Sequence, residues 1–325
     1  MILVMYSNFL PSDRHRAALA GLERGRRVHV AQDEEDAAAH APHAEIILGH
    51  RYLRQSLPHA KRLRWVQSTA GGIDILQAPE LLNPQIVVSR NPVHAPVIAR
   101  HALAMAWALL RRIPEAALFQ AQGKWAAPSL LMPLPLPRTA LVMGLGEIGK
   151  AICRLLRALG IKTLGTARGG SEEQRAACDE FIFFDDWRSA LGDSDLCFIA
   201  LPLARSTRGI LGASEMGLLL PHALIVNIAR GLILDMNALE TALRAGRLGG
   251  AAVDVLDPIP DSDSSLWHTP HLLITPKTAS YDPGMQERTE QFIERQVARY
   301  LRGETPLNAV DKTTLEESMD KENPA

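Results

Sequence analysis

One stretch of the chain, "TALVMGLGEIGKAICRLLRALG" at residues 139–160, constrains the fold more than any other. A short apolar run leads directly into glycines with G-x-G-x-x-G spacing, Gly144, Gly146 and Gly149, and a helical pattern follows. Gly144 would permit a tight turn, Gly146 would let the backbone approach a pyrophosphate, and Gly149 would let the helix pack close to the sheet. The free N–H groups at the helix start would then bind the anion. The sequence therefore predicts a dinucleotide-binding turn, and the alternative is a glycine turn that holds no ligand.

The next strand, "IKTLGTA" at residues 161–167, carries the signal for the type of dinucleotide. In this fingerprint an Asp or Glu at the strand tip holds the ribose hydroxyls of the adenosine. Here the tip is Thr166-Ala167-Arg168, which has no carboxylate to repel a 2′-phosphate and has an arginine that can face one. We therefore expect NADP(H) as the favoured cofactor, with NAD(H) as the alternative. Arg168 could instead be a solvated surface residue, with the choice of cofactor made elsewhere.

Apolar strand-like runs alternate with helical segments along the chain, which is typical of α/β folds with parallel sheets. An amphipathic helix over 95–116 and a Pro-rich connector at 130–137, which cannot be helical, separate two groups of strands. The first helix is expected to end at Gly25, a long helix begins near 288, and the polar tail from 311 is expected to be frayed. The expected strands are "MILVMYS", "RVHVAQ", "AEIILGH", "LRWVQST" and "IVVSRN" in the first group, and "TALVMG", "IKTLGTA", "LCFIALP", "ALIVNIA", "AAVDVL" and "HLLITP" in the second.

Composition excludes several classes of protein. Net charge is −1, which gives no bulk basic surface for nucleic acid or anionic lipid. The best apolar stretch, "HALAMAWALL" at 101–110, is too short for a membrane span and fits a buried helix. The N-terminal segment lacks the pattern of a signal peptide, and the cysteines at 153, 178 and 197 have no metal-binding spacing and are expected to be reduced thiols. We expect a cytoplasmic protein.

Several further motifs, in order and spread over almost the whole chain, resemble those of the D-2-hydroxyacid dehydrogenase family. They are "VQSTAGGID" (66–74), "GLGEIG" (144–149), "LPLARSTRGIL" (201–211), "VNIARG" (226–231), "AAVDVLDP" (251–258), "ITPKTAS" (274–280) and "YLRGETPLNAVD" (300–311).

The resemblance implies two flavodoxin/Rossmann-like lobes with parallel sheets, one inserted into the other. A substrate lobe would comprise residues 1–101 and 288–325, and a cofactor lobe residues 102–287. The active cleft would lie at the crossovers, near 97–105 and 282–292. Members of the family are usually homodimers joined through the cofactor lobe.

The resemblance also implies hydride transfer between a nicotinamide and C2 of a 2-oxo or 2-hydroxy acid, with glyoxylate- or hydroxypyruvate-type acids as the default. Arg230 matches the catalytic arginine that binds the substrate, and Ala70, Gly71 and Gly72 match the loop that receives its carboxylate. Asp254 matches the residue that faces the nicotinamide amide. The alternatives are a buried structural role for Arg230, a plain turn at residues 70–72, and a strand-end cap at Asp254. The residues expected to contact the cofactor are Gly144, Gly146, Glu147, Ile148, Gly149, Arg168, Leu201, Pro202, Thr207, Ile228, Ala229, Arg230, Asp254, Lys277 and Ala279.

The catalytic pair of the family is absent from this sequence. The acid/base histidine after "TP" is replaced by Lys277, and the glutamate five residues beyond Asp254 is replaced by Ile259. A glutamate would stabilise the ammonium of a lysine, whereas burial beside Arg230 without that partner would favour the neutral amine. The leading hypothesis is therefore a reductase in which Lys277 protonates the substrate oxygen.

Two other hypotheses fit the same substitutions. In one, the protein binds NADP(H) without turnover and acts as a sensing or partner-binding module, although the intact Arg230 and "STAGG" loop argue against it. In the other, Lys277 binds an extra anionic group of the substrate and the proton comes from His94, His101, Tyr281 or water.

Other positions receive weaker assignments. His268 and His271 have H-x-x-H spacing but no further ligands, so we reject a zinc site there. Arg100 stands where the family usually has glutamate, and the sequence does not decide its role. Side-chain specificity is expected from 48–56, where Arg51 and Arg54 are more simply a solvated basic face, and from 126–137 and 281–285.

Overall fold

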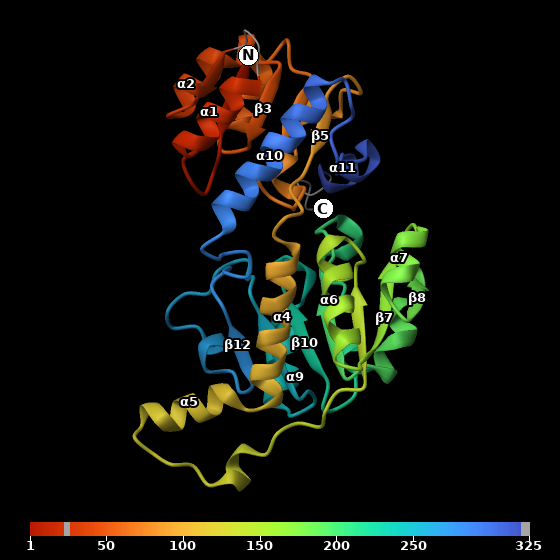
Figure 1. The fold of residues 1–325 in the computed structure, drawn as a ribbon. Helices are drawn as coiled ribbons and strands as arrows, with labels where there is room; N and C mark the ends of the chain where they lie inside the picture. The colour runs from red at the N-terminus through yellow and green to blue at the C-terminus, as the bar shows by residue number, and fades with distance from the viewer. Residues whose placement is uncertain (23–26, 320–325) are drawn as a thin grey trace. The chain divides into compact units, whose positions relative to one another are not determined.

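The computed structural model describes residues 1–22 and 27–319. The chain divides into two compact units, one formed by residues 1–94 and 282–325 and the other by residues 95–281 (Figure 1). Both boundaries fall a few residues before the expected ones, 101/102 and 287/288. The reason is that helix α4 (Ala95–Leu110) packs along its whole length in the core of the second unit, with Ala99, Ala102 and Met105 against α6 and the sheet.

The first unit is built on a five-stranded parallel sheet with the order β2-β1-β3-β4-β5. Strand β1 is buried on both faces of the sheet. Ile2 and Val4 belong to the apolar cluster on one face, and Leu3 and Met5 belong to the cluster on the other. Such uninterrupted apolar strands are typical of parallel sheets covered by helices on both sides. The strands are β1 (Ile2–Met5), β2 (Val28–Val30), β3 (Ile46–Gly49), β4 (Trp65–Gln67) and β5 (Val87–Ser89).

Helices from both ends of the chain cover this sheet. Leu19 of α1 lies in the same buried cluster as Phe292, Ile293 and Val297 of α10, so the last long helix completes a core begun by the first residues. The helices are α1 (Asp13–Leu22), α2 (Glu34–His40), α3 (Leu53–Ser56), α10 (Met285–Leu301) and α11 (Lys312–Met319).

The second unit is built on a seven-stranded parallel sheet with the order β12-β11-β10-β9-β6-β7-β8. The strand order reverses beside β6, which pairs with β7 on one side and β9 on the other. In open sheets of this kind, ligands bind beyond the carboxyl ends of the strands at this reversal. The strands are β6 (Thr139–Met143), β7 (Lys162–Ala167), β8 (Glu180–Phe183), β9 (Leu196–Ile199), β10 (Leu224–Asn227), β11 (Gly250–Val253) and β12 (Leu272–Ile274).

The helices of the second unit are α4, α5 (Ile113–Ala121), α6 (Glu147–Ala158), α7 (Glu172–Ala177), α8 (Ala213–Met216) and α9 (Met236–Arg244). The α/β architecture with two parallel sheets agrees with the expected fold class. None of the helices in the described part of the chain is long and apolar enough to cross a membrane.

Four local expectations differ from the structure. The single helix over 95–116 breaks at Arg112, whose φ is 57°, because the ring of Pro114 cannot follow a continuous helix turn. The tail is not wholly frayed, since α11 buries Leu315 in the first unit, while residues 320–325 lie outside the described part, as does Gly25. Strand β8 was not anticipated, and the connector begins with a 3₁₀ turn over Pro128–Leu131.

Candidate active site

The glycine turn after β6 has the geometry that a bound dinucleotide needs. Gly144 has a φ of 100°, and a Cβ there would lie 2.7 Å from the Ala200 carbonyl oxygen. A Cβ on Gly149 would lie 1.8 Å from the Gly144 oxygen, so α6 can approach the turn only with glycine at that position. A Cβ on Gly146 would meet nothing within 4 Å, which leaves its backbone surface open to a ligand. Gly146 is also the N-cap of α6 and supplies no capping side chain.

The start of α6 and the end of β7 lie beside this turn. Glu147 and Ile148 begin α6, and Glu147 is paired with Lys150 at 2.7 Å. Arg168 directly follows the end of β7 and its side chain is exposed. No acidic side chain stands at that strand tip, as the sequence states.

The segment after β9 folds back on itself. Leu201 is buried beneath the glycine turn, and Pro202 beside it is exposed. The Thr207 hydroxyl donates to the Pro202 carbonyl oxygen at 2.7 Å and accepts from the Ala204 N–H at 2.8 Å. Thr207 therefore shapes this segment, and its direct contact with a cofactor stays a prediction.

An asparagine fixes the loop that carries Arg230. The buried side chain of Asn227, at the end of β10, accepts from the Ala229 N–H and donates to the Arg230 carbonyl oxygen, both at 3.0 Å. The Arg230 guanidinium is half-buried and donates to the Ala229 oxygen at 2.6 Å. Gly231 follows with no room for a Cβ, which would lie 2.4 Å from the Asp257 nitrogen. Ile228 and Ala229 are buried on the same loop.

Asp254 organises the loop that contains the lysine. Its Oδ1 accepts from the Thr275 hydroxyl at 2.6 Å and from the Thr278 N–H at 2.9 Å, and its Oδ2 accepts from the buried Ala279 N–H at 3.0 Å. The Lys277 N–H donates to the Asp254 carbonyl oxygen at 2.9 Å. This is the capping arrangement left open by the sequence, and a role toward a nicotinamide stays a prediction.

The sequence led us to expect that Lys277 would be buried, and the structure differs. The side chain is exposed, and its backbone is in the left-handed region with a φ of 56°. Ile259 is also 80% exposed. The expectation of burial was wrong because the Asp254 carboxylate holds the loop by its backbone and leaves the lysine side chain outside.

A histidine that the sequence treated as secondary belongs to this cluster. His101 Nε2 on α4 lies 3.1 Å from the Thr275 hydroxyl and 3.5 Å from Asp254 Oδ1. Thr275 donates to Asp254, so its oxygen is free to accept from His101. Sequence spacing could not show this contact, because 174 residues separate His101 from Thr275.

The glycine loop after β4 lies in the first unit. The Ser68 hydroxyl accepts from the Ala70 N–H at 3.0 Å, and the Asn91 N–H donates to the Ala70 oxygen at 2.9 Å. Within residues 1–22 and 27–319, the N–H groups of Gly71 and Gly72 donate no hydrogen bond, so they are available to an anion.

His50 supports this loop from beneath. Its Nδ1 lies 3.3 Å from the Ser68 hydroxyl and 3.4 Å from that of Thr69, and its Nε2 lies 3.0 Å from Ser7. Burial lowers the pKa of His50 to about 4, against the opposing effect of Asp74. The neutral ring acts as a hydrogen-bonding support, and no motif in the sequence indicated this role.

The remaining candidates have ordinary structural surroundings. His94 is buried with Nε2 3.1 Å from the Thr289 hydroxyl, and burial lowers its pKa. His271 Nδ1 is paired with Glu115 at 2.8 Å. The side chains of Arg51, Arg54, Arg100 and Tyr281 are exposed, and the three cysteines are buried and free.

The loops of the second unit thus gather at one edge of its sheet. The glycine turn follows β6, the Arg230 loop follows β10, Asp254 follows β11 and Lys277 follows β12, and all these strands are parallel. This edge presents anion-binding backbone, a guanidinium, an exposed ammonium and a carboxylate–histidine pair. The arrangement suits a dinucleotide together with a small anionic substrate.

Fold and glycine-turn geometry define a nucleotide-binding α/β protein. A sequence profile described as "D-isomer specific 2-hydroxyacid dehydrogenase, NAD binding domain" matches residues 103–279, more than half of the chain. The chain belongs to the D-isomer specific 2-hydroxyacid dehydrogenase family, whose members are NAD(P)-dependent oxidoreductases of small 2-oxo and 2-hydroxy acids.

Individual relatives agree with this. The chain is 28% identical to a glyoxylate reductase of Thermococcus litoralis over 276 residues, 82% of each chain. It is 30% identical to a glyoxylate reductase of Thermococcus onnurineus over 268 residues, 79% of this chain and 78% of the relative. A D-isomer specific 2-hydroxyacid dehydrogenase from Xanthobacter autotrophicus Py2, in complex with NADPH and MES, is 25% identical with a TM-score of 0.78, covering 97% and 99% of the two chains.

Two glycine substitutions should separate ligand approach from fold. Gly146→Ala places a methyl group in open space, so the melting temperature should change by about 2 °C or less, while NADPH binding weakens because the methyl group blocks the pyrophosphate. Gly149→Ala forces backbone apart, so it should cost about 1–3 kcal/mol of stability and abolish binding. Fluorescence titration and thermal unfolding measure both.

Gly21→Ala is the matched control. A Cβ at position 21 also meets nothing within 4 Å, and the residue belongs to the first unit, away from the glycine turn in sequence. It should leave NADPH binding unchanged. Wild-type affinity in the Gly149→Ala protein would contradict the assignment of the turn.

Proposed function

We propose that this protein is an NADP(H)-dependent reductase that converts a 2-oxo acid of the glyoxylate or hydroxypyruvate type to a 2-hydroxy acid, in the cytoplasm and as a homodimer. The observation that carries the proposal is the convergence of the glycine turn, Arg230 and Lys277 at the carboxyl edge of one parallel sheet. The relatives named glyoxylate reductase support the choice of substrate class.

Arg230 is assigned to the substrate. Its planar guanidinium can bind a carboxylate or polarise the neighbouring carbonyl, and the Asn227 hydrogen bonds fix the backbone from which it extends. The proposal assigns the Gly71 and Gly72 N–H groups to the substrate carboxylate, and their availability supports that role. A reduced nicotinamide supplies the hydride when bound.

Lys277 is assigned the role of proton donor. The reduced substrate carries a forming alkoxide, and a positioned acid that gives it a proton contributes about 10²–10⁴-fold in rate. The loop that carries Lys277 is held by three hydrogen bonds to the Asp254 side chain, so the backbone position of the lysine is fixed although its side chain is exposed.

The exposure of Lys277 favours a second arrangement. An exposed ammonium can bind an additional anionic group of the substrate, and His101, paired with Asp254 through Thr275, would then be the proton donor. A carboxylate that orients a histidine is a general design for acid–base catalysis.

Charge-conserving substitution distinguishes the two arrangements. If Lys277 is the acid, Lys277→Ala and Lys277→Arg should both lower kcat with NADPH and a panel of 2-oxo acids by about 100-fold or more, because a guanidinium does not release its proton. If Lys277 only binds an anion, Lys277→Arg should recover most of the activity, and His101→Asn should carry the loss in kcat. Steady-state oxidation of NADPH measures all three variants.

Lys162→Ala is the control, because Lys162 is an exposed lysine at the opposite, amino end of β7. It should leave kcat and KM unchanged. A wild-type protein that binds NADPH and reduces none of the acids would exclude both arrangements and favour a binding module without turnover.

The preference for NADP(H) is assigned to Arg168. Removing one charge-assisted hydrogen bond to the 2′-phosphate should weaken NADPH binding by about 10- to 100-fold, so Arg168→Gln should raise the Kd for NADPH and leave the Kd for NADH unchanged. Arg154→Gln is the control, because Arg154 is also an exposed arginine but lies on α6. Equal affinity of the wild-type protein for NADH and NADPH would argue against this role.

The homodimer is supported by an exposed apolar arm in the second unit. Helix α5 and the connector after it run away from the sheet of that unit, as Figure 1 shows in yellow. Trp125 is 98% exposed, and the arm also exposes Ile113, Leu118, Met132 and Leu136. Several large apolar side chains exposed on one segment are typical of a protein interface, and a second copy joined through this unit would cover them.

Light scattering tests the dimer. The wild-type protein should have about twice the 35.6 kDa mass of the chain, and the double variant Leu118→Ser, Trp125→Ser should shift toward the monomer. Leu307→Ser, which changes an exposed leucine of the first unit, should remain dimeric. A monomeric wild-type protein would contradict this part of the proposal.

A further inference from the structure

A second cluster of reactive side chains lies in the first unit, on residues that the proposed function does not use. His29 is on β2, and Asp36 and His40 are on α2, in the sequence "HVAQDEEDAAAH". In the part of the chain that the structure describes, these three residues form the only group of three His, Cys, Asp or Glu side chains whose ligand atoms all lie within 4.8 Å of one another.

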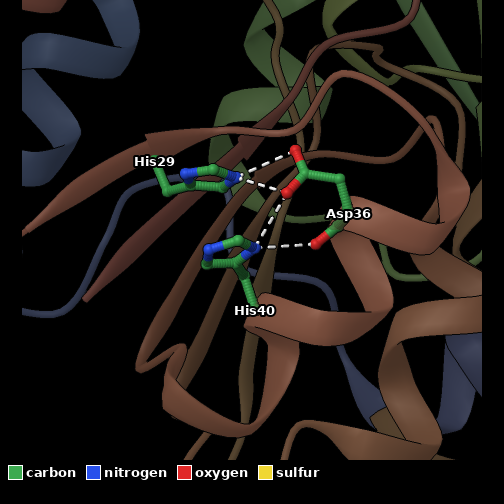
Figure 2. Close-up of side chains that lie close together, drawn as sticks. All are labelled: His29, Asp36 and His40. Carbon is green, nitrogen blue, oxygen red and sulfur yellow. Dashed lines mark hydrogen bonds and ion pairs between the residues drawn. The ribbon is translucent and has the colours of Figure 1, made fainter.

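Figure 2 shows how the three side chains converge. His29 Nε2 lies 2.9 Å from both carboxylate oxygens of Asp36, and His40 Nδ1 lies 2.9 Å from Oδ1 of the same carboxylate. The two imidazole rings are stacked, with centroids 3.6 Å apart and planes inclined by 16°. His40 Nδ1 also lies 2.9 Å from the backbone carbonyl oxygen of Asp36. Two ring nitrogens and one carboxylate are thus close enough together to share one ion.

The local fold produces this convergence. Asp36 and His40 are four residues apart on a helix, so they lie one turn above each other on the same face. The Asp33 side chain caps that helix by accepting from the Asp36 N–H, and the Gln32 N–H donates to Asp36 Oδ2 at 3.0 Å. Strand β2, at the edge of the sheet, brings His29 alongside.

The Asp36 carboxylate is held in place by hydrogen bonds. It accepts from the Gln32 N–H at 3.0 Å, and both imidazoles lie 2.9 Å from it. The histidines would release the protons that now bridge to Asp36, as metal binding generally requires.

The ligand types select the kind of ion. Mg²⁺ and Ca²⁺ prefer oxygen ligands, whereas imidazole nitrogen suits Zn²⁺, Ni²⁺ and Cu²⁺. With bonds of about 2.0–2.2 Å, ligand atoms around a tetrahedral ion are about 3.3–3.5 Å apart. The nitrogen–oxygen separations of 2.9 Å would have to open by a few tenths of an ångström.

The surroundings leave room for a further ligand. His29 and His40 line a cavity of about 650 Å³ that His43, Arg27 and Arg62 also line. The positive charges of the two arginines oppose any cation, so binding depends on the imidazole nitrogens and the carboxylate, and they favour an anion in the cavity.

We propose that His29, Asp36 and His40 bind one divalent transition-metal ion of the Zn²⁺ type, beside the cavity that both histidines line. The ion would tie β2 to α2 and so stabilise the first unit, because a ligand that binds only the folded state raises its stability. This site is separate from the edge that carries Arg230 and Lys277 and does not depend on turnover.

Zinc titration of the full-length, chelator-stripped protein tests the proposal. Calorimetry should give one Zn²⁺ per chain, and saturating zinc should raise the melting temperature. His29→Gln and His40→Gln should each weaken binding by about tenfold or more, the scale on which changes around a metal reduce its affinity, and each should remove the zinc-dependent rise. His59→Gln, an exposed histidine of the same unit outside the cluster, should behave like wild type.

Two further measurements distinguish loss of metal binding from a folding defect. Asp36→Asn keeps the size of the side chain and removes its charge, so it should fold and bind zinc more weakly. Cobalt added to the wild-type protein should give the intense visible absorption of a four-coordinate site with nitrogen and oxygen ligands. Absence of zinc binding in the wild-type protein, or unchanged binding in both histidine variants, would overturn the proposal, as would a cavity that takes only phosphate.

Discussion

All strands in the described part of the chain run parallel to their neighbours, and a parallel sheet is stable only when both faces are buried. The parallel direction requires a crossover between successive strands, so within each sheet every carboxyl end lies at the same edge. The glycine turn, Asn227, Asp254 and the lysine loop therefore share one edge of their sheet although more than a hundred residues separate the first from the last. Each strand end is then locked by its own hydrogen bonds, such as those of Asn227 to Ala229 and Arg230.

Features of local origin could be predicted from the sequence. The glycine spacing indicated the turn after β6, because Gly144 and Gly149 leave no room for a Cβ there, and the apolar runs indicated the two parallel sheets. Features that depend on distant contacts could not. The contact of His101 with Thr275 and Asp254 joins segments far apart in the chain, and the burial of Leu315 depends on a core made by the first unit. Strand β8 was missed because its short sequence, "EFIF", begins with a charge at the sheet edge.

The loop that carries Lys277 is held in place without the lysine side chain. The Asp254 carboxylate binds backbone N–H groups and the Thr275 hydroxyl, none of which depends on the residue at position 277. The loop can therefore accept a different side chain there without losing its support. The cost is a non-glycine residue with a φ of 56°, a backbone conformation that is uncommon for lysine.

The first unit joins residues from both ends of the chain, whereas the second is one continuous segment, and this has a consequence for synthesis on the ribosome. The second unit can close its core once residue 281 has emerged. The five strands of the first unit will already have been made, but the apolar face that Ile2 and Val4 share with Phe292 and Val297 is covered only in part, by Leu19 of α1, until α10 follows. During that interval the nascent chain exposes the rest of this face, which makes this the period when aggregation or chaperone binding would act on it.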